Sequence, residues 1–148
     1  MIPSPELSPG YDHEPQVIID AAYYDRLERI AYGAQQRFPS VATRLIREID
    51  RGLILPSEKM PANVVNIGSE VTYRDDMSGR DHTVTLVLPV GANISEGRVS
   101  VLTPVGAALI GLSEGASIDW ETNAGEQRQL TIIRVVSAAS CRHVATPD

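Results

Sequence analysis

The spacing of apolar residues predicts helices in the first third of the chain and strands in the rest. After Asp20, a residue type well suited to cap a helix, Tyr23, Leu27 and Ile30 recur at helical spacing as far as residue 32. A second helix is predicted over residues 40–51, where apolar residues again fall on one face. Helices of about a dozen residues are marginal alone, so we expect these two to pack together as an antiparallel hairpin.

From residue 64 onward, apolar and polar residues alternate, which is typical of strands with one buried face. In the last strand the apolar set slips from Leu130 and Ile132 to Ile133 and Val135, a pattern that indicates a β-bulge. Five short strands with one brief helix predict an antiparallel α+β domain. The predicted strands cover residues 64–73, 83–88, 98–102, 118–120 and 127–136.

The brief helix is predicted between Thr103 and Gly111. The Thr103 hydroxyl can cap it, and Pro104 suits the first helical position, where an N–H group would lack a partner. Gly111 can adopt the left-handed conformation that ends a helix, and Gly115 can form the tight turn that follows.

Changes in composition divide the chain into segments. Residues 1–15 are rich in proline and are predicted to form a flexible tail, and residues 16–55 form the helical hairpin. A proline-containing linker over residues 53–62 leads to the sheet domain at residues 62–136, and residues 137–148 form a second flexible tail.

The composition is ordinary for a globular protein: 43% of the 148 residues are hydrophobic and 22% are charged. No apolar run is long enough to span a bilayer and no secretory signal is recognisable, so we expect a cytoplasmic protein without a membrane partner. The net charge of −6 argues against direct binding to a nucleic-acid backbone. We expect a monomer.

The sequence carries no motif of a known catalytic site. It has no nucleophile elbow, phosphate-binding loop or Cys-x-x-Cys pair, and its three histidines are scattered. Asp75 and Asp76 lie in a Ser/Gly-containing turn, where such residues are mostly turn formers and not metal ligands. Asp119 and Glu121 are expected on a solvated strand face beside Trp120. We therefore expect no catalytic residues, cofactor or metal.

Two motifs resemble the GreA/GreB family of transcription factors. Thr-Pro-Val-Gly-Ala-Ala-Leu-Ile-Gly over residues 103–111 is similar to the Ser-Pro-Leu-led signature of that family's C-terminal domain, and Asn-Ile-Gly-Ser-Glu-Val over residues 66–71 is similar to its first strand. The short front half and the Ile-Asp-Trp sequence at residues 118–120 look closer to the Rnk branch, the regulators of nucleoside diphosphate kinase. The resemblance, clear over residues 62–136, implies an FKBP-like antiparallel sheet domain after a short helical hairpin.

The resemblance also implies a partner. In Gre factors the matching loop contacts the coiled-coil rim of the β′ subunit of RNA polymerase, which carries over to Thr103, Pro104, Val105 and Gly106. The chain departs from the family pattern here, with Thr for Ser and the smaller Val for Leu. An alternative is that Pro104 and Gly106 only start the helix and allow it to pack closely.

The expected tip of the hairpin, residues 31–40, contains neither Asp nor Glu. In Gre factors a longer coiled coil carries an acidic tip that helps to hold a catalytic Mg²⁺, an ion that requires oxygen ligands. The resemblance therefore does not extend to transcript cleavage. Aromatic residues of the tip either pack the turn or contact a partner. The candidate tip residues are Tyr32, Gln35, Gln36, Arg37 and Phe38.

These observations favour a non-enzymatic regulator of transcription elongation that binds RNA polymerase near its secondary channel. It would compete with Gre factors without stimulating cleavage. Three alternatives remain open: a true Gre-type cleavage factor, an FKBP-like peptidyl-prolyl isomerase, and direct control of nucleoside diphosphate kinase. An isomerase uses a pocket lined by several aromatics, whereas the sheet domain supplies only Tyr73 and Trp120.

Overall fold

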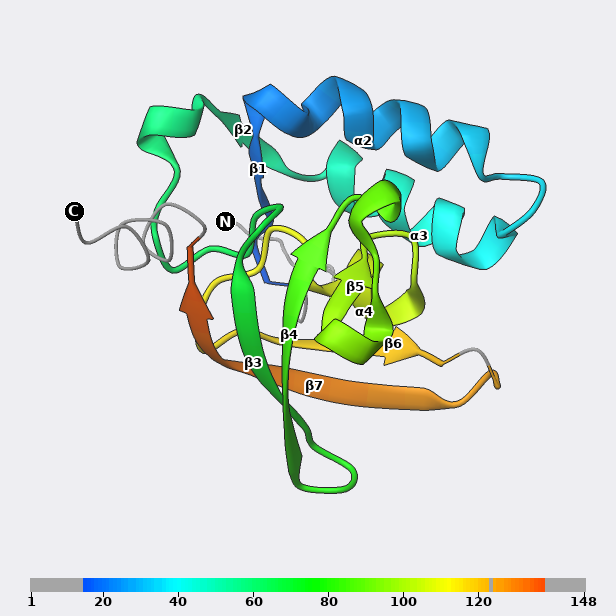
Figure 1. The fold of residues 1–148 in the computed structure, drawn as a ribbon, viewed down its shortest axis with the longest axis vertical. Coiled ribbons are helices and arrows are strands. Elements are labelled where there is room, and N and C mark those ends of the chain that lie inside the picture. The colour runs from blue at the N-terminus through cyan, green and yellow to red at the C-terminus, as the bar shows by residue number, and fades with distance from the viewer. Residues whose placement is uncertain (1–14, 123, 138–148) are drawn as a thin grey trace, which may run out of the picture.

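The computed structural model describes residues 15–122 and 124–137, so the predicted tails fall almost entirely outside the described residues. Two helices lie side by side over a curled sheet (Figure 1). In chain order the helices and strands are β1 (Ile18–Asp20), α2 (Ala21–Gly33), α3 (Pro39–Asp50), β2 (Leu53–Leu55), β3 (Glu70–Asp75), β4 (Arg80–Val87), β5 (Arg98–Ser100), α4 (Pro104–Leu109), β6 (Ser117–Glu121) and β7 (Gln127–Val136).

The first long helix begins at the cap that the sequence predicts. The Asp20 carboxylate accepts a 2.8 Å hydrogen bond from the Ala22 N–H and so begins α2. Pro39 occupies the first turn of α3, where its missing N–H costs nothing. Residues 34–38 connect the two helices, which pack against each other.

The five-stranded sheet has the order β5-β4-β3-β7-β6. The prediction of a purely antiparallel sheet was wrong, because β4 and β5 are parallel. Residues 88–97, which include two short 3₁₀ turns, return the chain so that β5 runs in the direction of β4. Parallel pairing requires such a crossover instead of a tight hairpin.

A second, two-stranded parallel sheet joins β1 to β2. Sequence reasoning treated residues 53–55 as part of a linker, which was wrong: the Leu53 N–H donates to the Val17 carbonyl at 2.8 Å. The α2–α3 hairpin is the crossover between these two strands. The Ile18 N–H also donates to the Gly111 carbonyl at 3.0 Å, which ties the base of the hairpin to the end of α4.

The start of β3 differs from the prediction, whereas the bulge in β7 agrees with it. The strand predicted from residue 64 begins only at Glu70, because Asn66 and Ser69 side chains bond nearby backbone N–H groups and compete with ladder formation. The bulge predicted in β7 is confirmed by a register shift opposite Thr72 and Tyr73. It leaves Ile133 41% exposed and returns Val135 to the buried face.

One hydrophobic cluster runs from the hairpin into the sheet. Leu27 and Leu45 of the two long helices belong to the same cluster as Leu109 of α4 and Leu130 of β7. α3 packs directly on α4, and α4 packs on β6. The hairpin therefore rests on the sheet domain through α4, and this contact sets the position of α3 relative to β6.

Candidate functional site

The corner at the start of α4 is built as its sequence predicts. The Thr103 hydroxyl accepts a 3.1 Å hydrogen bond from the Gly106 N–H and donates one of 2.7 Å to the Ser100 carbonyl. Pro104 begins the helix, and Gly111 has a positive φ of 82° just beyond its end. The corner is thus fixed by a cap, a proline and a turn.

The four residues of this corner differ in accessibility. Thr103, Pro104 and Val105 are partly exposed, and Val105 also packs against the core. Gly106 is buried, and a Cβ atom there would lie 2.1 Å from the Ser100 carbonyl oxygen. Gly106 is therefore explained by close packing, while the other three residues keep part of their surface accessible.

The tip of the α2–α3 hairpin is open to solvent. All five candidate tip residues are exposed, with Tyr32 at 52% and Phe38 at 47% of their surface. The Arg37 guanidinium lies 5.7 Å from the centre of the Phe38 ring, within range of a cation–π interaction. The tip thus offers aromatic, amide and cationic groups.

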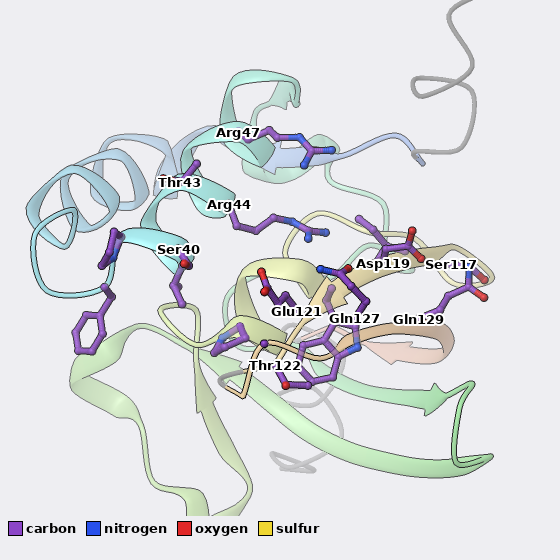
Figure 2. Close-up of a pocket in the computed structure, with 17 residues that line it drawn as sticks. Ser40, Thr43, Arg44, Arg47, Ser117, Asp119, Glu121, Thr122, Gln127 and Gln129 are labelled. Carbon is purple, nitrogen blue, oxygen red and sulfur yellow. The ribbon is translucent and has the colours of Figure 1, made fainter.

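A groove of about 950 Å³ connects the tip to the corner (Figure 2). Phe38 and residues of α3 form one wall, Pro104 lies at the corner, and the β6–β7 hairpin forms the other wall. Sequence reasoning identified Phe38 and Pro104 separately and did not bring them together. The polar residues that line the groove are Ser40, Thr43, Arg44, Arg47, Ser117, Asp119, Glu121, Thr122, Gln127 and Gln129.

The charge of the groove is mixed. Arg44 donates from Nε to the carboxylate of Glu48 at 2.8 Å, and Glu48 is fully buried and also accepts from Arg51 Nε at 2.7 Å. Figure 2 shows Arg44 extending from α3 toward the strand that carries Asp119. The sequence predicted Asp119 and Glu121 as solvated strand residues, and both are indeed exposed. Nothing in the sequence paired them with arginines about 75 residues away.

Trp120 contributes a polar atom to this region. Its indole Nε1 is buried and has no hydrogen-bond partner among the described residues, and its side chain lines the groove. A buried donor without a partner typically costs about 1–3 kcal/mol.

Asp75 is a turn former, as predicted. Asp75 accepts a 3.0 Å hydrogen bond from the Met77 N–H and pairs with Arg128. Burial raises the pKa of Asp75, but the Met77 N–H and the Arg128 charge outweigh it and lower the pKa below its usual value. Within the described ranges, no group of three or more His, Cys, Asp or Glu residues could hold a metal ion, and no helix is long and apolar enough to cross a membrane.

Comparison with known proteins identifies the family. Residues 60–137 match the family model described as transcription elongation factor, GreA/GreB, C-term. The chain belongs to the GreA/GreB family. The family motifs at residues 66–71 and 103–111 both lie inside the matched region, so the resemblance seen in the sequence is confirmed.

Relatives within and around this family cover most of the chain. The regulator of nucleoside diphosphate kinase from Escherichia coli K12 is 33% identical over 121 residues, which cover 82% of this chain and 89% of that protein. Transcription elongation factor GreA from Syntrophomonas wolfei is 32% identical over 81 residues, covering 55% of this chain and 51% of that factor.

A solved structure extends the likeness to the fold. The prokaryotic transcription elongation factor GreA/GreB from Nitrosomonas europaea is 31% identical and superposes with a TM-score of 0.65. The match covers 83% of this chain and 99% of that one. The predicted mixed helix-and-sheet architecture is therefore a GreA/GreB-like α+β fold.

Proposed function

We propose that this protein is an RNA polymerase-binding regulator of transcription elongation. It docks near the secondary channel, with Thr103, Pro104 and Val105 against the coiled-coil rim of the β′ subunit, and competes with Gre factors without stimulating cleavage. Family membership supports the partner. The proposal that the protein does not stimulate cleavage is supported by the hairpin tip, which is exposed and has no carboxylate side chain.

The corner has the physical character of a docking loop. Its backbone is held by the Thr103 cap and the Pro104 ring, so little conformational entropy is lost when a partner binds. Val105 presents part of an apolar side chain while the rest packs on the core. A small, rigid, partly apolar anchor of this kind suits a contact with the side of a helix pair.

The hairpin is too short and too poor in oxygen ligands for Gre-type chemistry. The 13 residues of α2 extend about 20 Å at 1.5 Å per residue. Mg²⁺ is usually held by one or two carboxylates, and the tip carries an arginine instead. The tip would occupy space in the channel without recruiting the metal.

The alternatives receive less support. An FKBP-like isomerase requires several aromatic side chains around one pocket, but Tyr73 is buried and stacks on His82, and it does not line the groove. Phe38 and Trp120 are the aromatic residues among those that line it. The E. coli relative is named as a regulator of nucleoside diphosphate kinase. We infer that any such effect here follows from transcription.

Two assays test this function. In a pull-down with core RNA polymerase, we expect the native protein to bind and Pro104→Ala to weaken binding about tenfold. The substitution removes the ring that restrains the backbone of the corner and part of the surface that contacts the partner. Pro61→Ala is the matched control, because Pro61 is exposed and lies outside the groove.

In the second assay the protein is added to a backtracked elongation complex. It fails to restart the complex and slows restart by a Gre factor in proportion to its concentration. Restart at a Gre-like rate by the protein alone would reject the non-catalytic function. Unchanged binding of Pro104→Ala would move the docking site away from the corner.

A further inference from the structure

Strand β6 is an edge of the five-stranded sheet. In the part of the chain that the structure describes, β6 pairs with β7 alone. The Thr122 N–H donates to the Glu126 carbonyl at 2.9 Å and the Ile132 N–H to the Ala116 carbonyl at 2.8 Å. These bonds mark the even-numbered residues of β6 as those whose backbone groups face β7.

The odd-numbered residues consequently face the other way. In an antiparallel pair, alternate residues turn their N–H and C=O groups away from the neighbouring strand. The outward-facing backbone groups of β6 therefore belong to Ser117, Asp119 and Glu121. All three residues line the groove, so a row of backbone donors and acceptors opens into it.

Helix α3 supplies the wall opposite this edge. Figure 2 shows Ser40 and Arg44 extending from α3 on one side of the groove and Asp119 lying on the other. α3 packs on α4, which covers the core side of β6. A strand placed along β6 would thus turn one set of side chains toward Arg44 and Arg47 and the alternate set toward the outer face beside Asp119 and Glu121.

The charges decide between occupants of this edge. A second copy of the chain, paired antiparallel about the centre of β6, would place Asp119 directly opposite its own counterpart, an unfavourable arrangement. Arg44 already pairs through Nε with Glu48, so a partner would add to the existing contacts of the arginines. A segment with basic residues beside Asp119 and Glu121 and acidic residues facing Arg44 and Arg47 matches the sign of charge on both walls.

We propose that the groove between α3 and β6 binds an extended segment of another protein as an added strand on β6. The segment has alternating charge, with acidic side chains toward Arg44 and Arg47 and basic side chains beside Asp119 and Glu121. Backbone hydrogen bonds supply affinity and the two charged walls supply selectivity, as in other strand-addition complexes. A groove of about 950 Å³ has room for a short extended peptide. The inference does not depend on polymerase docking.

The test uses a nine-residue peptide of alternating Lys and Glu, capped at both ends, at physiological salt. Trp120 is the one tryptophan of the chain and lines the groove, so its fluorescence reports binding of a peptide that has no aromatic residue. A block peptide with all Lys residues before all Glu residues is the composition-matched control. The alternating peptide binds and changes the Trp120 emission, and the block peptide binds at least about tenfold more weakly.

Two variants at one position separate backbone pairing from charge. Asp119→Pro removes an outward N–H group without breaking a bond to β7, and edge strands tolerate proline in that orientation. It weakens peptide binding about tenfold, whereas Asp119→Ala, which keeps the N–H group, weakens it about threefold. Circular dichroism and thermal unfolding verify that both variants fold.

Three results would overturn the proposal. These are no binding of the alternating peptide at about 1 mM, equal binding of the two peptides, or native affinity in Asp119→Pro. Sedimentation of the protein alone as a dimer that Asp119→Pro dissociates would assign the edge to a second copy instead. Failure of the polymerase pull-down would leave the peptide result unaffected, so the two proposals are judged separately.

Discussion

At the scale of single residues, Asp20 does more than cap a helix. Its carboxylate accepts hydrogen bonds from the Ala22 N–H at 2.8 Å, the Ser57 hydroxyl at 2.6 Å and the Asn66 amide at 2.9 Å. These donors come from α2, from the segment after β2 and from the segment before β3. One side chain therefore joins the base of the helical hairpin to the sheet domain.

Replacing the Asp20 side chain should lower the stability of the protein. Asp20→Ala removes the cap and the acceptor of the exposed Ser57 hydroxyl and of the partly buried Asn66 amide, so we expect the free energy of unfolding to fall by about 1–2 kcal/mol. Urea denaturation at pH 7 measures it. Asp25→Ala is the control on the same helix, because Asp25 is exposed and should change stability by less than about 0.5 kcal/mol.

The same carboxylate gives a dependence on pH. Burial raises the pKa of Asp20, but the hydrogen bonds from Ser57, Asn66 and Ala22 outweigh it and lower the pKa below the ordinary 3.8. A lowered folded-state pKa contributes stability above pH 3.8 that is lost as the pH falls through the folded value. The stability difference between the native protein and Asp20→Asn should therefore shrink between pH 5 and pH 2. A constant difference would contradict this account.

At the scale of elements, α4 depends on one close approach. The six residues of α4 are too few to be helical alone, and its glycine lets the helix backbone approach the end of β5. Gly106→Ala places a methyl group 2.1 Å from the Ser100 carbonyl, so we expect a loss of at least about 3 kcal/mol in stability. Thermal and urea unfolding measure it.

Gly33 provides the matched control for that substitution. It lies in α2, and a Cβ atom there would have nothing within 4 Å. Gly33→Ala should raise stability by up to about 1 kcal/mol through helix propensity alone. If both alanine variants had the same effect, close packing at Gly106 would not be the cause.

At the scale of the whole molecule, the hairpin and the sheet domain share one core. Leu45 of α3 is fully buried and belongs to the cluster that includes Leu109 and Leu130. The α2–α3 hairpin and the corner at the start of α4 are therefore held in a fixed relation, with the groove between them.

This arrangement predicts cooperative unfolding. Helical circular dichroism and Trp120 fluorescence should report one transition, and Leu45→Ala should lower the free energy of unfolding by about 2–5 kcal/mol in both signals. Ile133→Ala, at a position 41% exposed, should cost about 0.5 kcal/mol. Two separate transitions would show that the hairpin and the sheet fold independently.

Local signals were sufficient for much of this protein. The caps at Asp20 and Thr103, the proline that starts α4 and the bulge in β7 follow from backbone chemistry and periodicity, which act over a few residues. The family motifs and the absence of acidic residues at the hairpin tip were likewise evident from the sequence.

Long-range pairing was decided by the tertiary structure alone. The parallel pairing of β1 with β2, the β4–β5 crossover, and the groove that brings Phe38, Pro104 and Asp119 together all join residues distant in the chain. Periodicity specifies which face of an element is buried but not which partner buries it, because many partners satisfy the same apolar pattern. Helix α3 packs on α4, and α4 packs on the edge strand β6. Only this packing places the arginines of α3 opposite β6 across the groove.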